Sequence, residues 1–124
     1  VSGVSSDKRD VEAAAAAGNE RAKLASDMLN YQIKKYVGAY AAVMGGLDCV
    51  VFTGGIGEND GYVREQVCKN MEFLGIKLDE EKNKLRGQDI IDLSAADSRV
   101  KVLMVCTNEE LMIARDTLAL VTAK

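Results

Sequence analysis

The sequence predicts an α/β fold in which helices flank a mixed sheet. Two runs have the composition of strands: residues 49–53 are apolar or β-branched, and residues 100–106 are apolar at nearly every position. Between residues 19 and 44, apolar side chains recur every three or four positions, which predicts a long helix. At 124 residues, the chain has the length of one small domain.

Composition excludes several classes of function. The net charge of −3 provides no basic patch, so we expect no nucleic-acid partner. No apolar run reaches membrane-spanning length, so we expect no membrane partner and a cytoplasmic location. The chain has no histidine, which removes the usual general base and the commonest metal ligand. Cys49, Cys68 and Cys106 lie in apolar stretches and are expected to be buried, reduced thiols.

Capping residues predict the first two helices. Ser6 or Asp7 can cap a short helix that continues through an alanine run and stops at Gly18. Asn19 then opens the long helix, which the glycine pair 45–46 ends. Small residues at 38–39 and 41–42 would let another helix, or another subunit, approach closely.

A glycine cluster follows the first strand, which its apolar composition predicts to be covered on both faces. Gly54, Gly55 and Gly57 permit a sharp turn or a close approach of the backbone. Asn59 or Asp60 can cap the helix that follows. A strand, a glycine turn and a helix N-terminus in this order can form a binding site for a phosphorylated ligand. A tight turn without a ligand is the alternative.

The second half is predicted to alternate helices and strands. A helical stripe begins at residue 63 and ends at Gly75, and Asp79 can cap a short charged helix through residue 85. Strands are expected at 90–93 and at 100–106, the latter internal to the sheet. Thr107 and Glu110 have capping-box spacing at the start of a final helix. The stripe expected to be buried on that helix is Leu111, Ala114, Leu118 and Val121.

The residue sequence around the glycine cluster points to one protein family more specifically than its chemistry does. Residues 51–59, Val-Phe-Thr-Gly-Gly-Ile-Gly-Glu-Asn, closely resemble a signature of the acetate kinase family, within the acetate and sugar kinase/Hsc70/actin superfamily. Residues 2–10 and 107–116 resemble two other parts of the same family, in the same order. With residues 36–42, the likeness covers essentially the whole chain.

This resemblance implies a fold and an activity. The fold would be the C-terminal part of a ribonuclease H-like (actin-like ATPase) domain, with residues 1–124 as its nucleotide-binding portion and an N-terminal domain outside this sequence. The activity would be reversible phosphoryl transfer from ATP to acetate, giving acetyl phosphate and ADP, with Mg²⁺ or Mn²⁺ and in a homodimer. Propionate or butyrate kinase is the alternative within the class. A non-catalytic nucleotide-binding or dimerisation module is the alternative outside it.

The resemblance also implies site residues. Glu109 would hold Mg²⁺, as a hard oxygen ligand does; on its own chemistry it is equally a favourably placed carboxylate in a helix first turn. No residue of this chain matches the family's acetate-binding arginine, its transition-state arginine and histidine or its catalytic aspartate, so we expect the isolated chain to be inactive. Lys8 replaces a residue that is usually apolar or aromatic in the family. The residues expected beside the nucleotide are Asp7, Lys8, Arg9, Gly55, Ile56, Gly57, Glu58 and Asn59.

Overall fold

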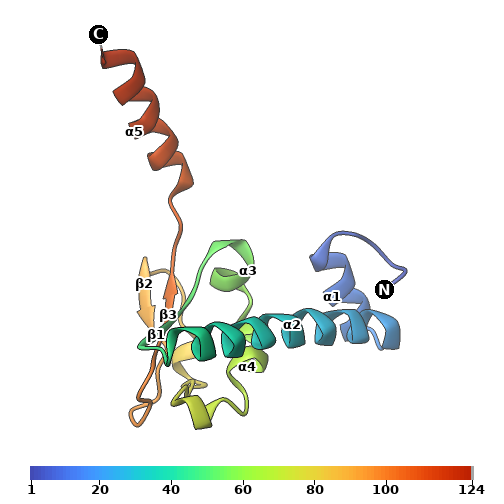
Figure 1. Ribbon diagram of the computed structural model, residues 1–124. Helices are drawn as coiled ribbons and strands as arrows, with labels where there is room; N and C mark the ends of the chain where they lie inside the picture. Colours follow the sequence, from blue (N-terminus) through green and yellow to red (C-terminus); the bar gives the residue numbers. More distant parts are fainter. Residues whose placement is uncertain (124) are drawn as a thin grey trace.

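The computed structural model describes residues 1–123 and confirms a mixed sheet with helices beside it (Figure 1). The sheet has three strands in the order β1-β3-β2. In chain order the elements are α1 (Lys8–Ala16), α2 (Glu20–Met44), β1 (Cys49–Phe52), α3 (Gly54–Asn59), α4 (Gly61–Cys68), the 3₁₀ helices η1 (Glu72–Leu74) and η2 (Lys82–Lys84), β2 (Ile90–Asp92), β3 (Lys101–Val105) and α5 (Glu109–Thr122).

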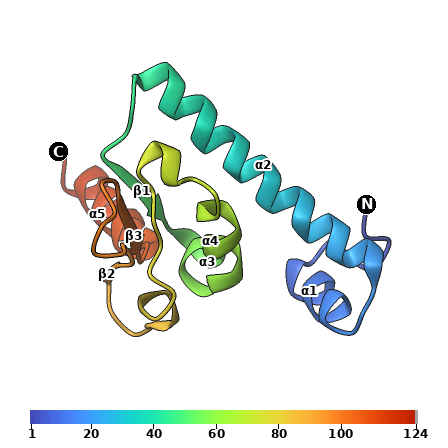
Figure 2. The same ribbon diagram turned by 90° about the horizontal axis from the view of Figure 1, so that it is seen from below.

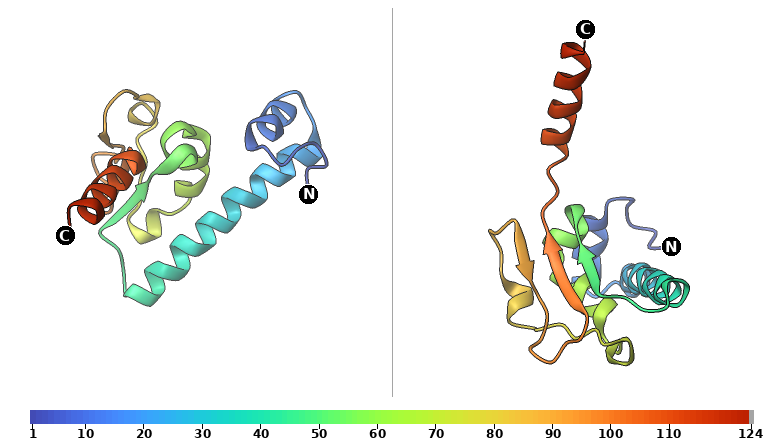
Figure 3. Two further views of the ribbon diagram at one scale, coloured as in Figure 1. Left: turned by 90° about the horizontal axis from the view of Figure 1, so that it is seen from above. Right: turned by 60° about the vertical axis from the view of Figure 1, so that its left-hand side comes forward.

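Strand β3 is the centre of the sheet, as its apolar sequence predicted. It pairs in parallel with β1, where Phe52 lies opposite Met104, and antiparallel with β2, where Ile91 lies opposite the same residue (Figure 3). The prediction that the first strand is covered on both faces is wrong, because Cys49 and Val51, which share one face of β1, are exposed within residues 1–123. Its side chains alternate, so Phe52 is buried while Val51 is 51% exposed.

The core lies between α4 and the sheet. The buried side chains that form it are Phe52, Val63, Val67, Cys68, Met71, Ile76, Ile91, Leu93, Val100, Val102 and Met104. Burial raises the pKa of the Cys68 thiol to about 12, so it stays protonated. Cys49 and Cys106 are free but exposed, so the expectation of buried thiols is wrong for these two.

Local capping places α1 and α2 as the sequence predicted. The Asp7 carboxylate accepts the N–H of Arg9 and caps α1, and the Asn19 side chain accepts two N–H groups at the start of α2. Helix α2 ends at Gly45, whose φ of +75° is in the left-handed region that glycine tolerates. Helix α1 packs against the N-terminal half of α2 (Figure 2).

The helix expected to run to Gly75 is shorter. Helix α4 ends at Cys68, because Asn70 takes a φ of +58° and turns the chain before the 3₁₀ helix η1. Asp79 does accept the N–H groups of two following residues, but the helix it precedes is the single 3₁₀ turn η2.

Helix α5 extends away from the rest of the chain (Figure 1). None of its residues is buried, so the predicted buried stripe is wrong: Leu118, for example, is 61% exposed. The predicted capping box is also wrong, because the Asn108 side chain caps this helix by accepting the Leu111 N–H at 3.0 Å. Across residues 1–123, no helix is both long and apolar enough to cross a membrane.

Candidate functional site

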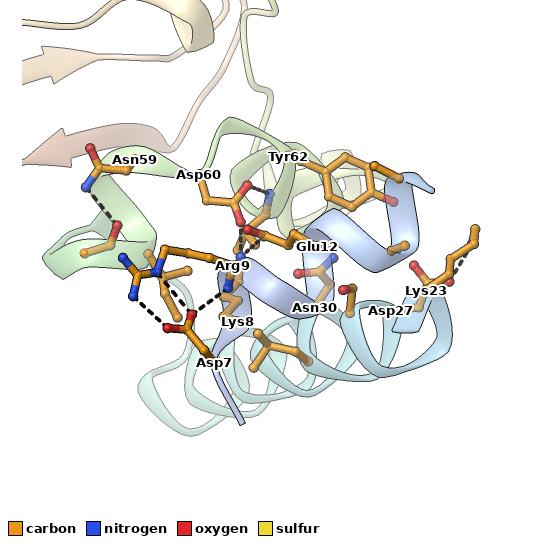
Figure 4. A pocket seen from close by; sticks show the side chains of 17 residues that line it. Asp7, Lys8, Arg9, Glu12, Lys23, Asp27, Asn30, Asn59, Asp60 and Tyr62 are labelled. Atoms are coloured by element: carbon orange, nitrogen blue, oxygen red, sulfur yellow. Dashed lines mark hydrogen bonds and ion pairs between the residues drawn. The ribbon is translucent and has the colours of Figure 1, made fainter. Parts of the chain in front are cut away.

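A cavity of about 900 Å³ lies between α1, α2, α3 and the start of α4 (Figure 4). It brings together two segments that are some fifty positions apart in the sequence. Small-molecule sites have volumes of roughly 300–1,000 Å³, so the cavity is large enough for a nucleotide. Six of the eight residues predicted beside a nucleotide line it: Asp7, Lys8, Arg9, Gly55, Ile56 and Asn59.

Asp7 and Arg9 form a hydrogen-bonded ion pair at the start of α1. The Asp7 carboxylate accepts the Arg9 backbone N–H at 2.8 Å and two guanidinium N–H groups, at 3.1 and 2.6 Å. The hydrogen bonds from Arg9 lower the pKa of Asp7 to about 2, so the carboxylate is charged at neutral pH. The Arg9 side chain is 88% exposed and extends from α1 toward α3 (Figure 4). A guanidinium oriented in this way can bind an anionic group.

Lys8 links α1 to the start of α4. Its ammonium pairs with Glu12 one turn along α1 and with Asp60, which caps α4 by accepting the Val63 N–H at 3.0 Å. Burial raises the pKa of Asp60, but the hydrogen bonds from Lys8 and Val63 outweigh it and leave this pKa below its ordinary value. Lys8 therefore contributes an ion pair to the cavity wall.

Gly57 and Glu58 lie outside the cavity, behind its α3 wall. The glycine turn is itself helical, since α3 spans Gly54–Asn59. Its first residue, Gly54, takes a φ of +68°, in the left-handed region that glycine tolerates. Gly57 is packed so closely that a Cβ there would lie 2.8 Å from the carbonyl carbon of Phe52. Glu58 accepts the backbone N–H of Thr107 at 2.8 Å and its hydroxyl at 3.0 Å, and these bonds lower the pKa of the carboxyl group.

Sequence reasoning missed the α2 side of the cavity. Lys23, Asp27 and Asn30 line it from α2, and Tyr62 lines it from α4 (Figure 4). Asn30 is only 6% exposed, and its Oδ1 has no hydrogen-bond partner within the described part of the chain. The helical neighbours of Asn30 are mostly polar, among them Asp27 and Lys34, so the sequence held no local signal that this residue is buried.

Glu109 lies in the first turn of α5, two residues after the Thr107 that Glu58 holds. Residues 1–123 contain no group of three or more potential metal-ligating side chains. Mg²⁺ is commonly held by one or two carboxylates together with phosphate oxygens and water, rather than by an all-protein cage. An exposed carboxylate such as Glu109 fits a metal site of that open kind as a single protein ligand.

The fold defines a class of protein. A mixed sheet with helices beside it, and a glycine-rich helix immediately after its first strand, belongs to the actin-like ATPase class of α/β folds. The model of the acetokinase family matches residues 1–115, and the chain belongs to this family.

Similar proteins agree with that placement. The chain is 59% identical over 120 residues to an acetate kinase of Phocaeicola vulgatus, covering 97% of this chain and 30% of the relative. A crystal structure of Porphyromonas gingivalis acetate kinase matches with a TM-score of 0.87 and 54% identity, over 98% of this chain and 31% of that one. A propionate kinase of Francisella tularensis matches with a TM-score of 0.75 and 36% identity, over 89% of this chain and 28% of that one. The chain thus spans about 30% of the length of the curated relatives it matches.

Proposed function

We propose that this chain is the C-terminal, nucleotide-binding portion of an acetate kinase, which transfers the γ-phosphoryl group of ATP to acetate. In that reaction an acetate oxygen bonds to the γ-phosphorus while the bond to the oxygen bridging the β- and γ-phosphates breaks, giving acetyl phosphate and ADP. The observation that carries the proposal is the cavity in which the segment 7–9 meets Gly55, Ile56 and Asn59. High identity to curated acetate kinases supports the choice of reaction.

The proposed role of these residues is to bind and orient ATP. Phosphoryl transfer depends mainly on positioning and on neutralising charge, so a binding wall contributes directly to the rate. Ile56, which is 43% exposed, would pack against the base, and Gly55 would let ribose or phosphate approach the backbone. The guanidinium of Arg9, held by Asp7, would neutralise negative charge on the ligand.

Glu109 is the residue that we propose for Mg²⁺, or Mn²⁺ in its place. The ion would neutralise charge on the transferring phosphoryl group. This chain would supply a single hard oxygen ligand on the first turn of α5. The bonds of Glu58 to Thr107 would hold the start of that helix against α3, and so set where the Glu109 backbone lies relative to the cavity wall.

The reaction can be tested with the complete gene product. It should form acetyl phosphate from ATP and acetate, detected as the hydroxamate, while the purified 124-residue chain should show no acetate-dependent turnover. Turnover by the purified short chain would contradict this division of roles. Within the complete protein, Arg9→Gln should raise the KM for ATP. Arg21→Gln is the matched control, because Arg21 is also an exposed arginine but lies outside the cavity.

Propionate kinase is the second candidate, since a propionate kinase shares the fold at 36% identity. Comparing kcat/KM for acetate, propionate and butyrate in the complete protein decides between them. We further propose a homodimer in the cytoplasm. If the complete protein binds ATP but phosphorylates none of the three acids, the alternative of a non-catalytic nucleotide-binding or dimerisation module replaces the kinase.

A further inference from the structure

Arg64 is a buried cation that the proposed nucleotide site does not directly use. It lies on α4 between two core residues, Val63 and Val67, and only 1% of its surface is exposed. Burying a charged group is costly unless its hydrogen bonds are replaced. The pKa of Arg64 is lowered by this burial and by the nearby charge of Arg86.

Neutral oxygens replace the water that Arg64 loses. Its Nη1 donates to the carbonyls of Gly57, at 2.7 Å, and of Glu58, at 2.9 Å. Its Nε donates to Oδ1 of Asn83 at 2.7 Å, and its Nη2 donates to the Asn83 carbonyl at 2.9 Å. Asn83 in turn donates to the Gly61 carbonyl at 2.8 Å. One guanidinium thus joins α3, α4 and η2.

The helix held in this way needs external support. Helix α3 has six residues, three of which are glycine, and both its length and its composition disfavour an independent helix. Three restraints hold its rear side: close packing of Gly57 on Phe52, the bonds of Glu58 to Thr107, and the bonds from Arg64. Gly55 and Ile56 are left facing the cavity.

We propose that Arg64, together with Asn83, is a positioning residue for the ATP site: it fixes the last turn of α3 and thereby the place of Gly55 and Ile56. This inference rests on the proposed function, since it names a determinant of the same site. The planar guanidinium of arginine can donate to two backbone segments at once, whereas the single ammonium of lysine cannot reproduce this geometry.

Arg64→Lys in the complete gene product tests the proposal. Lysine keeps the charge but cannot bond both segments, so the KM for ATP should rise about tenfold, the effect of losing about one hydrogen bond to the ligand. The KM for acetate should stay unchanged. Val67→Ala is the matched control. Val67 is 2% exposed on the same helix and takes no part in the hydrogen bonds of Arg64. It should lower the melting temperature without changing the KM for ATP.

Asn83→Ala provides a second variant in case Arg64→Lys does not fold. It removes the acceptor of the Nε bond and should also raise the KM for ATP selectively. If both variants keep the wild-type KM for ATP while the melting temperature falls, as expected for Val67→Ala, or if they raise the KM for ATP and the KM for acetate together, the positioning role is overturned while the proposed function stands. A wild-type protein with no saturable dependence on ATP overturns the proposed function and this inference with it.

Discussion

Helices α3 and α5 both follow a parallel strand, yet the chain holds them very differently. Helix α3 has six residues and a poor helical sequence, but Phe52, Arg64 and Thr107 fix it from behind. Helix α5 has fourteen residues and a regular apolar pattern, but none of its side chains is buried within the described chain. Tertiary contacts, rather than helical propensity, therefore decide which helix is held against the rest of the described chain, and that helix forms a wall of the candidate site.

The same substitution in the core and on α5 tests this contrast with the largest expected effect. Leu93 is 0% exposed, so Leu93→Ala should lower the free energy of unfolding by about 2–5 kcal/mol. Leu118 is 61% exposed, so Leu118→Ala should change it by no more than about 0.5 kcal/mol. Urea unfolding of the 124-residue chain measures both. A comparable loss at Leu118 would mean that α5 packs against the rest of the chain.

Two glycines within α3 sharpen the comparison. Gly57→Ala places a Cβ 2.8 Å from the carbonyl carbon of Phe52, and such overpacking should cost about 1–3 kcal/mol. Gly55→Ala is the control, because the added Cβ meets nothing within 4 Å and Gly55 has no positive φ. Denaturant midpoints should fall for Gly57→Ala and stay close to wild type for Gly55→Ala. Equal midpoints would remove the packing argument for Gly57.

Asp60 lies between the end of α3 and the start of α4, and its charge should make the stability of this region depend on pH. Its folded-state pKa lies below the unfolded value of about 3.9, so its stabilising effect is complete above that value and is lost as the pH falls through the folded pKa. Asp60→Asn should therefore be less stable than wild type by about 1–2 kcal/mol at pH 7. The difference should shrink as the pH drops below about 4. A difference independent of pH would show that the Asp60 charge contributes nothing.

Sequence reasoning succeeded where the interactions are local. The caps at Asp7, Asn19 and Gly45 depend on residues within a few positions of each other, so they can be predicted from the chain alone. The helix-capping role of Asn108 was missed because Thr107, which has the right spacing, instead bonds to Glu58, 49 positions earlier.

Burial and the candidate site depend on distant residues, and prediction was weaker there. The bonds of Arg64 reach 7 positions back to Gly57 and 19 forward to Asn83, and no spacing rule connects these three. The stripe on α5 was periodic, but periodicity does not supply a surface to pack against. The two segments lining the cavity were predicted to meet from the family resemblance, whereas the α2 wall had no such guide.

The last prediction concerns Glu109 and has the smallest expected effect on stability. As a carboxylate in the first turn of α5, Glu109 should contribute only about 0.3–1 kcal/mol, so Glu109→Gln should barely change the melting temperature. If Glu109 is a metal ligand, Glu109→Gln should greatly reduce turnover by the complete gene product and raise the Mg²⁺ concentration needed for half-maximal rate. Glu110→Gln is the matched control, since Asn108 caps the helix and leaves Glu110 with the same first-turn position but no proposed ligand role. Titrating Mg²⁺ against rate for both variants, beside thermal melts, separates the two readings of Glu109. Near-normal turnover with unchanged Mg²⁺ dependence in Glu109→Gln would leave this residue as one more exposed side chain on a helix that the described chain does not cover.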